Sequence, residues 1–113
     1  MEVNRDCLFC KIAQKTLTSK IIYENDHVLA FNDISPKAPI HILIIPKVHY
    51  STFQDVDTPG IYENLFSAAK AICKERKFDD FRLVINNGEM AGQTVFHLHL
   101  HLLAGRQFNW PPG

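Results

Sequence analysis

The chain has 113 residues, of which 46% are hydrophobic, and its 12 lysines and arginines balance 12 aspartates and glutamates. A chain of this length predicts one domain, spanning residues 1–113, with enough apolar side chains for a core of its own. The neutral charge argues against non-specific binding of nucleic acid, which needs an excess of cationic side chains. A small anionic ligand held by directed hydrogen bonds stays open.

No targeting or membrane segment is expected. The segment formed by the first six residues is polar in character, with four of the six polar or charged, and no apolar signal region follows it. The most apolar run, residues 40–46, is far shorter than the ~20 residues needed to cross a bilayer. The three cysteines are an odd number and accompany no signal sequence, which predicts a reducing compartment. We take this compartment to be the cytoplasm.

Two helices are expected. A short helix runs from about Cys7 to Lys15, with Asp6 in position to cap its first turn. A long helix follows Thr58, a good N-cap residue that precedes a proline, and its apolar positions repeat at helical spacing to about Lys77.

Five strands are expected from apolar and β-branched runs. They span residues 21–24, 27–31, 40–45, 81–86 and 95–103. The dipeptide Asn25-Asp26 fits a two-residue hairpin turn, and the prolines at 36 and 39 make the intervening segment a loop. Short connections between neighbouring strands predict an antiparallel sheet. The fold class is therefore α+β: a five-stranded antiparallel sheet with one short and one long helix, both on one face.

The last predicted strand carries the most informative pattern. Side chains of alternate residues share a face, which separates Phe96, Leu98, Leu100 and Leu102 from His97, His99 and His101. A single histidine on a strand is more often structural than functional. A solvated polar face would carry Lys, Thr or Glu rather than successive imidazoles, so the three histidines predict a site.

Spacing limits what the three imidazoles can do together. Same-face neighbours on a strand lie about 6.7 Å apart, so His97 and His101 are separated by roughly 13 Å. Because a zinc–nitrogen bond is only about 2.1 Å long, at most two of the three can comfortably share one ion. With an ordinary pKa of about 6.5, imidazole is mostly neutral at pH 7. The row therefore favours a neutral nucleophile beside a proton donor, with a phosphate ester or phosphoramidate as the natural target.

Residues 97–103 fit the pattern His-φ-His-φ-His-φ-φ, in which φ is apolar. Together with residues 31–39, 45–47 and 105–107 and the ending Trp-Pro-Pro-Gly at 110–113, they make the chain resemble the histidine triad family. Within that family it is most similar to the Hint branch, the purine nucleoside phosphoramidases. The resemblance covers nearly the whole chain.

The resemblance implies a mechanism. His99 would attack the α-phosphorus and form a nucleotidyl-histidine intermediate, which water hydrolyses to a nucleoside monophosphate. His101 would donate hydrogen bonds to the phosphate and leaving group, and His41 would orient the other histidines. Thr94 stands where the branch usually has serine, and no catalytic metal is implied.

The resemblance also implies a purine nucleotide as ligand, with Asp33 accepting hydrogen bonds from the ribose hydroxyls. The other implied nucleotide-binding residues are Phe9, Ile12, Phe31, Asn32 and Ile34 around the base, and Asn86, Gly92, Gln93, Thr94, His99 and His101 near the phosphate. On the residues alone, the aromatic and aliphatic members could equally belong to the core, and Asp33 could simply begin a turn.

Cys7 and Cys10 form a single Cys-x-x-Cys pair, which alone is half of a metal site or simply two core residues. By the resemblance, His49 and His97 supply the remaining ligands of a structural zinc. Two thiolates and two imidazoles make a closed tetrahedral site without an open position. A thioredoxin-like function is poorly supported, because no βαβ pattern surrounds the pair.

Family members form homodimers that join their sheets, with the tail, here about residues 106–113, at the site and interface. Neither nucleic acid nor membrane is expected as a partner. Two alternatives stay open. One is a dinucleoside polyphosphate hydrolase, against which the Trp-Pro-Pro-Gly ending argues, and the other is a nucleotide-binding adaptor with residual catalysis.

Overall fold

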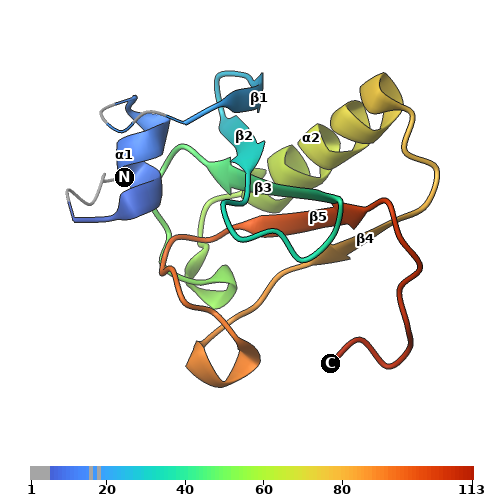
Figure 1. Ribbon diagram of the computed structural model, residues 1–113. Coiled ribbons are helices and arrows are strands. Elements are labelled where there is room, and N and C mark those ends of the chain that lie inside the picture. The colour runs from blue at the N-terminus through green and yellow to red at the C-terminus, as the bar shows by residue number, and fades with distance from the viewer. Residues whose placement is uncertain (1–5, 16, 18) are drawn as a thin grey trace.

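The computed structural model describes residues 6–15, 17 and 19–113 (Figure 1). Its elements are α1 (Leu8–Ala13), β1 (Ile21–Glu24), β2 (Val28–Asn32), β3 (Ile40–Pro46), α2 (Ile61–Arg76), β4 (Phe81–Val84) and β5 (Leu100–Ala104), with 3-10 turns at Phe53–Asp55 and Glu89–Ala91. The strands pair antiparallel in the order β1-β2-β3-β5-β4. The predicted α+β class and five-stranded antiparallel sheet are confirmed.

Residues 1–5, on which the expectation about a targeting signal partly rests, lie outside the described part of the chain. Across the described residues, neither helix has the length and apolar character that a membrane crossing requires.

The two helices cover opposite faces of the sheet, so the prediction that both lie on one face is wrong. β2 and β3 are buried at nearly every position, and a strand buried on both faces needs a cover on each. Ile42 and Ile44 pack in the cluster that contains the α2 side chains. Leu43 and Ile45, which alternate with them, pack with Phe9 of α1.

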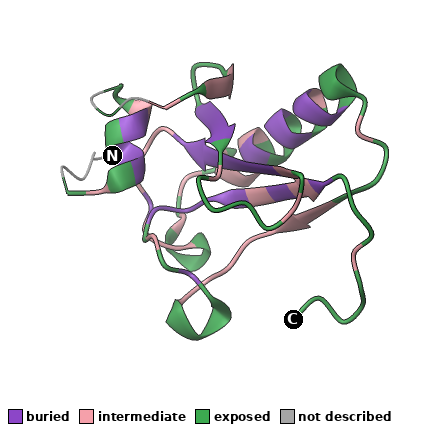
Figure 2. Cartoon of the chain, viewed as in Figure 1, coloured by how far each residue is buried: buried purple, intermediate pink, exposed green. Residues whose placement is uncertain are grey.

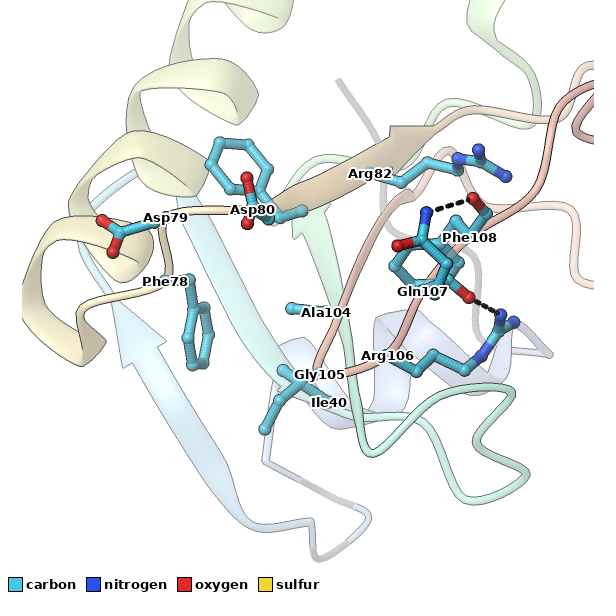
Figure 3. Close-up of a pocket in the computed structure, with 11 residues that line it drawn as sticks. Ile40, Phe78, Asp79, Asp80, Arg82, Ala104, Gly105, Arg106, Gln107 and Phe108 are labelled. Atoms are coloured by element: carbon cyan, nitrogen blue, oxygen red, sulfur yellow. Dashed lines mark hydrogen bonds between the residues drawn. The ribbon is translucent and has the colours of Figure 1, made fainter.

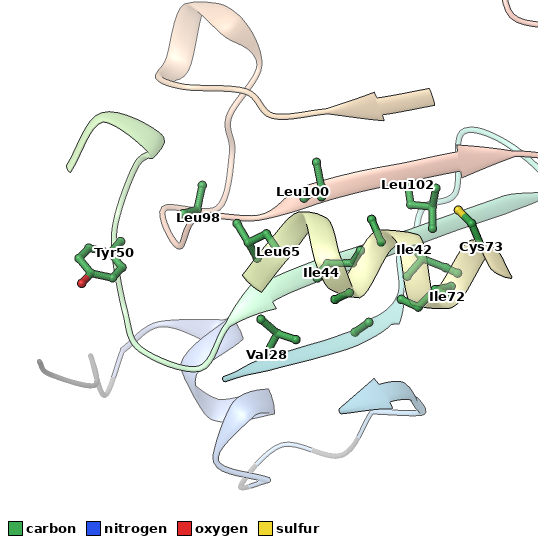
Figure 4. Close-up of a cluster of buried hydrophobic side chains, with 13 residues drawn as sticks. Val28, Ile42, Ile44, Tyr50, Leu65, Ile72, Cys73, Leu98, Leu100 and Leu102 are labelled. Atoms are coloured by element: carbon green, nitrogen blue, oxygen red, sulfur yellow. The ribbon is translucent and has the colours of Figure 1, made fainter. Parts of the chain in front are cut away.

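The cluster under α2 is the larger of the two and holds β5 in place (Figure 4). The buried face of α2 consists of Leu65, Ala68, Ala69, Ile72 and Cys73. Leu98, Leu100 and Leu102 meet this face from the histidine-rich segment. Figure 2 shows the same amphipathic pattern along α2, buried toward the sheet and exposed away from it. Because the leucine side of β5 faces α2, its histidine side faces α1.

α1 is capped by Cys7 and not, as predicted, by Asp6. The Cys7 Sγ atom accepts a hydrogen bond from the Cys10 backbone N–H at 3.3 Å. The helix has only six residues, far fewer than an isolated helix needs to be stable in water. Its position therefore depends on tertiary contacts.

α2 begins after Gly60, whose φ is 90°, and not after Thr58. The Thr58 hydroxyl accepts a hydrogen bond from Tyr50 Oη at 2.6 Å and donates to Asp57 Oδ1 at 3.2 Å. It is engaged before the helix starts, which explains why the predicted cap is wrong.

The first hairpin turn is centred one residue later than predicted, on Asp26 and His27. Asn25 N–H donates to Val28 O at 3.1 Å and closes the turn. Asn25 Oδ1 also accepts hydrogen bonds from the backbone N–H groups of His27 and Val28, at 2.8 and 2.9 Å. Asn25 is thus the first residue of the turn, held by its own side chain.

β5 begins at Leu100, five residues later than predicted. Pro46 at the end of β3 has no N–H to extend the ladder, and the Leu98 N–H donates to Tyr50 O at 2.6 Å instead. The alternation of side chains starts at Leu98, which is 1% exposed. Phe96, predicted to pack with the leucines, is 43% exposed.

Candidate active site and metal cluster

A cavity of about 510 Å³ lies on the α1 face of the sheet, a size usual for small-molecule sites. Most of the predicted nucleotide-binding residues line it: Phe9, Ile12, Phe31, Asn32, Asp33, Ile34, Asn86, Gly92, Thr94, His99 and His101. His41 lines it as well. The chain therefore brings together, in one concave site, residues that are up to 92 positions apart (from 9 to 101).

Gln93 is the exception among the predicted nucleotide-binding residues. Its side chain is 2% exposed and does not line the cavity. Its amide nitrogen donates to Ser51 O at 2.7 Å and to Val95 O at 3.1 Å, and its Oε1 accepts from Gly88 N–H at 2.8 Å. Gln93 braces the loop before the histidine segment through its side chain, and its contact with nucleotide stays a prediction.

The ring of His99 is oriented by a main-chain carbonyl. Its Nδ1 lies 2.7 Å from His97 O. A carbonyl oxygen can only accept, so Nδ1 carries the proton and Nε2 of the neutral ring carries the lone pair. His99 is 8% exposed, lines the cavity, and meets the edge of Phe9 with ring centroids 5.2 Å apart.

The ring of His101 is the opposite tautomer to that of His99, with its proton on Nε2 and its lone pair on Nδ1. Lys37 N–H donates to His41 Nδ1 at 3.0 Å, so the proton of neutral His41 is on Nε2. His41 Nε2 lies 2.9 Å from His101 Nδ1 and donates to it. The single ring proton of neutral His101 is therefore on Nε2. Among the side-chain nitrogens and oxygens of the described residues, this nitrogen is the buried one without a hydrogen-bond partner.

Strand register explains how His41 and His101 meet. β3 and β5 pair with Leu43 opposite His101 and with His41 opposite Leu103. His41 and His101 thus lie diagonally on one face of neighbouring strands, within reach of each other, and their ring centroids are 5.2 Å apart. Asp33 Oδ2 is 3.4 Å from His41 Nε2 and adds an acceptor at the same nitrogen.

Burial keeps these histidines neutral. It lowers the pKa of His101 to about 4, with smaller contributions from His99 and His41. Burial also lowers the pKa of His99 and of His41, although the Asp33 carboxylate opposes the shift in both. At pH 7 the cavity therefore presents a lone pair on His99 beside an N–H donor on His101, with ring centroids 4.9 Å apart.

Lys37 is the functional residue that sequence reasoning missed. Its contribution to His41 is made by the backbone, which side-chain chemistry does not reveal. The one available signal is its place in the Pro-Lys-Ala-Pro loop, which ends two residues before His41. Leu8, Ser19, Ser35, Leu43 and Val95 complete the cavity wall and were not predicted.

The four predicted metal ligands form a second cluster, with their ligand atoms all within 4.8 Å of one another. His97 Nδ1 lies 3.3 Å from Cys7 Sγ, 3.4 Å from Cys10 Sγ and 3.3 Å from His49 Nδ1. Cys10 Sγ lies 3.2 Å from His49 Nδ1. In a tetrahedral zinc site the bond lengths of about 2.1 and 2.3 Å separate ligand atoms by roughly 3.3–3.8 Å. The four residues fit a zinc ion.

Protonation in this cluster also suits a metal. His97 Nε2 lies 2.8 Å from Pro46 O and must donate to it, which leaves the lone pair on Nδ1, inside the cluster. Burial lowers the pKa of His97 to about 4 and also lowers that of His49. His49 Nε2 lies 3.2 Å from Ser51 Oγ, a partner of the kind that orients metal-bound imidazoles.

A second group of metal-compatible side chains is Asp33, His41 and His101, again with ligand atoms within 4.8 Å. This group offers one carboxylate and two imidazoles, whereas Cys7, Cys10, His49 and His97 offer the two thiolates and two imidazoles typical of a closed structural zinc site. The donor chemistry therefore favours the Cys7, Cys10, His49 and His97 cluster as the metal site.

The tail, residues 106–113, does not line the cavity of its own chain. It lies beside β4, where Arg82 Nη2 donates to Asn109 O at 2.8 Å (Figure 1). Trp110 is 83% exposed.

A sheet of this order with three clustered histidines defines the histidine triad class of proteins, and the comparisons agree. The family model described as HIT domain matches residues 14–108. A 14 kDa zinc-binding protein of Brassica juncea is 44% identical, covering 96% of this chain and 100% of that protein. The chain belongs to the HIT domain family.

Solved structures give the same result. A HIT family hydrolase of Legionella pneumophila has a TM-score of 0.90 and 45% identity, covering 95% of this chain and 99% of that one. A histidine triad protein of Clostridium difficile has a TM-score of 0.92 and 44% identity, covering 96% and 97%. The fold of this chain is that of the HIT family hydrolases.

Proposed function

We propose that this protein is a nucleotide hydrolase that cleaves purine nucleoside phosphoramidates and related α-phosphate adducts through a nucleotidyl-histidine on His99. The observation that carries the proposal is the hydrogen-bond pattern of the cavity. His97 O accepts the proton of His99 Nδ1, which leaves the lone pair of His99 on Nε2. The hydrogen bond from His41 to His101 Nδ1 leaves an N–H without a partner on His101 Nε2. A nucleophile and a donor beside it are what phosphoryl transfer through a covalent intermediate needs.

The steps use only these groups. His99 Nε2 attacks the α-phosphorus, the bond from phosphorus to the leaving amine breaks, and a phosphorus–nitrogen bond to the ring forms. Because the approach of the anion raises the pKa of the rings around it, the His41–His101 pair takes up one proton with the substrate. His101 Nε2–H donates to a phosphate oxygen and passes a proton to the leaving amine, which departs neutral. Water then attacks the phosphorus of the intermediate and gives up one proton to this pair, which releases the nucleoside monophosphate and restores His99.

The rest of the cavity suits a nucleoside. Phe9, Ile12, Phe31 and Ile34 supply an apolar wall for a base. The Asp33 side chain keeps 19% of its surface exposed at the cavity, where a carboxylate can accept from ribose hydroxyls. Asn86, Gly92 and Thr94 line the same cavity as His99 and His101, and we place them on the phosphate side of the proposed substrate.

We assign the Cys7, Cys10, His49 and His97 cluster to a structural zinc ion, in keeping with the name of the Brassica juncea relative. When bound, such an ion would fix α1 and the segment at His97, and it would leave catalysis to His99 and His101. None of Cys7, Cys10 and Cys73 is in a disulfide, a state that a reducing compartment such as the cytoplasm preserves.

The exposed edge of the sheet supports a homodimer. In the described residues β4 pairs with β5 alone, and an exposed edge strand is a ready template for pairing. Phe81 on this strand is 41% exposed, and Phe66 on α2 is 42% exposed. We infer that two copies join through this edge, with the tail near the interface.

Turnover of a fluorogenic adenosine phosphoramidate tests the proposed function. His99→Ala should lower kcat/KM roughly a thousand-fold or more, because the nucleophile is lost. His27→Ala, which removes an exposed imidazole in the first hairpin turn, should match the wild type. Wild-type turnover no faster than that of His99→Ala would contradict the proposal and favour a nucleotide-binding adaptor.

A further inference from the structure

The C-terminal tail, which does not line the cavity, contacts the backbone of Lys37, a residue that does line it. Arg106 donates to a single carbonyl, Lys37 O, through Nε at 3.2 Å and Nη2 at 3.1 Å. Its third bond, from Nη1, goes to Gln107 O at 3.0 Å. Two bonds from a rigid planar guanidinium to one acceptor fix position and direction better than a lysine would.

Neighbouring contacts hold Arg106 in this orientation (Figure 3). Its guanidinium lies 4.3 Å from the centre of the Phe108 ring, and that of Arg82 lies 5.1 Å from the same ring. Gly105 has a φ of 97°, and a Cβ built on it would lie 3.0 Å from the Pro39 side chain. The turn at Gly105 thus packs the start of the tail directly against the 37–39 segment.

Lys37 also carries the N–H that orients His41. The hydrogen bonds that link Lys37, His41 and His101 can run in two directions, because each neutral imidazole can carry its proton on either nitrogen. When the Lys37 N–H donates to His41 Nδ1, the last group of this hydrogen-bond series, His101 Nε2, is a donor. Without that N–H, His41 can carry its proton on Nδ1, and His101 Nε2 becomes a lone pair facing the substrate.

We propose that Arg106 is a positioning residue for catalysis: by holding Lys37 O, it keeps the Lys37 N–H on His41 and thereby keeps His101 Nε2 a hydrogen-bond donor. This inference rests on the proposed function for its catalytic consequence. Its structural part, the direction of the histidine chain, stands independently of any substrate.

The other group that faces His41 Nε2 limits the expected size of the effect. Asp33 Oδ2, at 3.4 Å, favours the same direction of the chain, so loss of Arg106 should shift the balance of tautomers without inverting it. Asp33 itself is held locally, by its N–H on His41 O at 2.9 Å and by Ser35 N–H on its Oδ1 at 2.7 Å. Nucleotide binding should therefore change little.

The matched comparison is Arg106→Gln against Arg82→Gln. Arg82 also contacts Phe108 and the tail, through Asn109 O, but it makes no hydrogen bond to Lys37. For Arg106→Gln we expect kcat to fall roughly five- to ten-fold, a fraction of a full acid–base contribution, with the Kd of the nucleoside monophosphate within two-fold of wild type. Arg82→Gln should keep kcat within two-fold, and Arg106→Lys should restore only part of it.

Nitrogen chemical shifts of the imidazoles, from long-range proton–nitrogen correlation spectra, read the tautomers directly. Arg106→Gln should move His41 and His101 toward the reversed direction, and Lys37→Pro, which deletes the N–H, should move them further. Lys37→Ala keeps the N–H and should leave the tautomers unchanged. Equal elution volumes in size-exclusion chromatography would confirm that the variants fold alike.

The readouts separate the two proposals. Shifted tautomers in an enzyme that turns over no phosphoramidate would overturn the proposed function and leave the role of Arg106 in the chain supported. Wild-type nitrogen shifts in both Arg106→Gln and Lys37→Pro would overturn the role of Arg106. So would a loss of kcat that is equal in Arg106→Gln and Arg82→Gln.

Discussion

His99 and His101 are identical side chains two positions apart, and their hydrogen-bond partners make them different reagents. A main-chain carbonyl holds the proton of His99 on Nδ1. The main-chain N–H of Lys37 donates to His41, His41 in turn donates to His101 Nδ1, and the proton of His101 is therefore on Nε2. In both cases the backbone sets the tautomer, which is a firmer constraint than another side chain could supply.

Acid should destabilise this arrangement in a defined pH window. Burial lowers the pKa of His101 to about 4 in the folded chain, whereas the unfolded chain titrates near 6.5. Because the unfolded state binds more protons between these values, the free energy of unfolding falls as the pH drops from 6.5 to 4. His101→Gln removes this contribution, so its thermal midpoint should fall less than that of the wild type between pH 7 and pH 5. Equal falls in the two proteins would contradict the assignment.

At the scale of elements, α1 contributes more than its six residues suggest. Cys7 and Cys10 place it in the metal cluster, and Phe9 between them reaches the edge of the His99 ring and the cavity wall. The same short segment thus joins the metal site to the base pocket. His97 joins them a second time, through its ring in the cluster and its carbonyl on His99.

Elemental analysis of protein purified without chelators should find about one zinc ion per chain. The Cys7→Ser, Cys10→Ser double variant should bind none, and its thermal midpoint should be lower by roughly 5 °C or more, since α1 is too short to persist alone. Hydrogen exchange should show faster exchange in residues 7–13, with little change in α2. Cys73→Ser, a buried thiol outside the cluster, is the control that should retain zinc. A metal-free wild type would contradict the assignment.

Element types were predictable from the sequence because periodicity and turn residues report them directly. The five strands and two helices followed from such patterns, whereas most residues of the cavity were implied only by the resemblance to the histidine triad family. Three features followed from neither. The opposite placement of the helices depends on burial of both faces of β2 and β3, and the late start of β5 depends on Pro46. The contribution of Lys37 is made by a backbone N–H, which no side-chain pattern encodes.

At the scale of the whole molecule, the feature that matters for assembly is the exposed edge of β4 together with the C-terminal tail. The tail is tied to its own β4 by Arg82 and Phe108 and leaves Trp110 exposed. We propose that the β4 edge, with the tail beside it, meets a second copy of the chain. A closed two-fold dimer would cover that edge in both chains at once.

Sedimentation equilibrium should therefore give a mass near twice the 12.9 kDa of one chain. Leu83→Pro, which removes a backbone N–H from the edge strand, should shift the equilibrium toward the single chain, because proline disrupts strand pairing. Leu83→Ala, which keeps the N–H, is the control for the lost side chain. A wild-type mass that stays at one chain across micromolar concentrations would contradict the dimer.

The most direct test of the central claim is intact-protein mass spectrometry of enzyme mixed with adenosine 5′-phosphoramidate and quenched with base during turnover. We predict a species heavier than the chain by one adenylyl group, with fragmentation placing the group on the ring of His99, and its absence from His99→Ala. Turnover with no adduct on rapid quenching, or an adduct on a residue other than His99, would contradict this account.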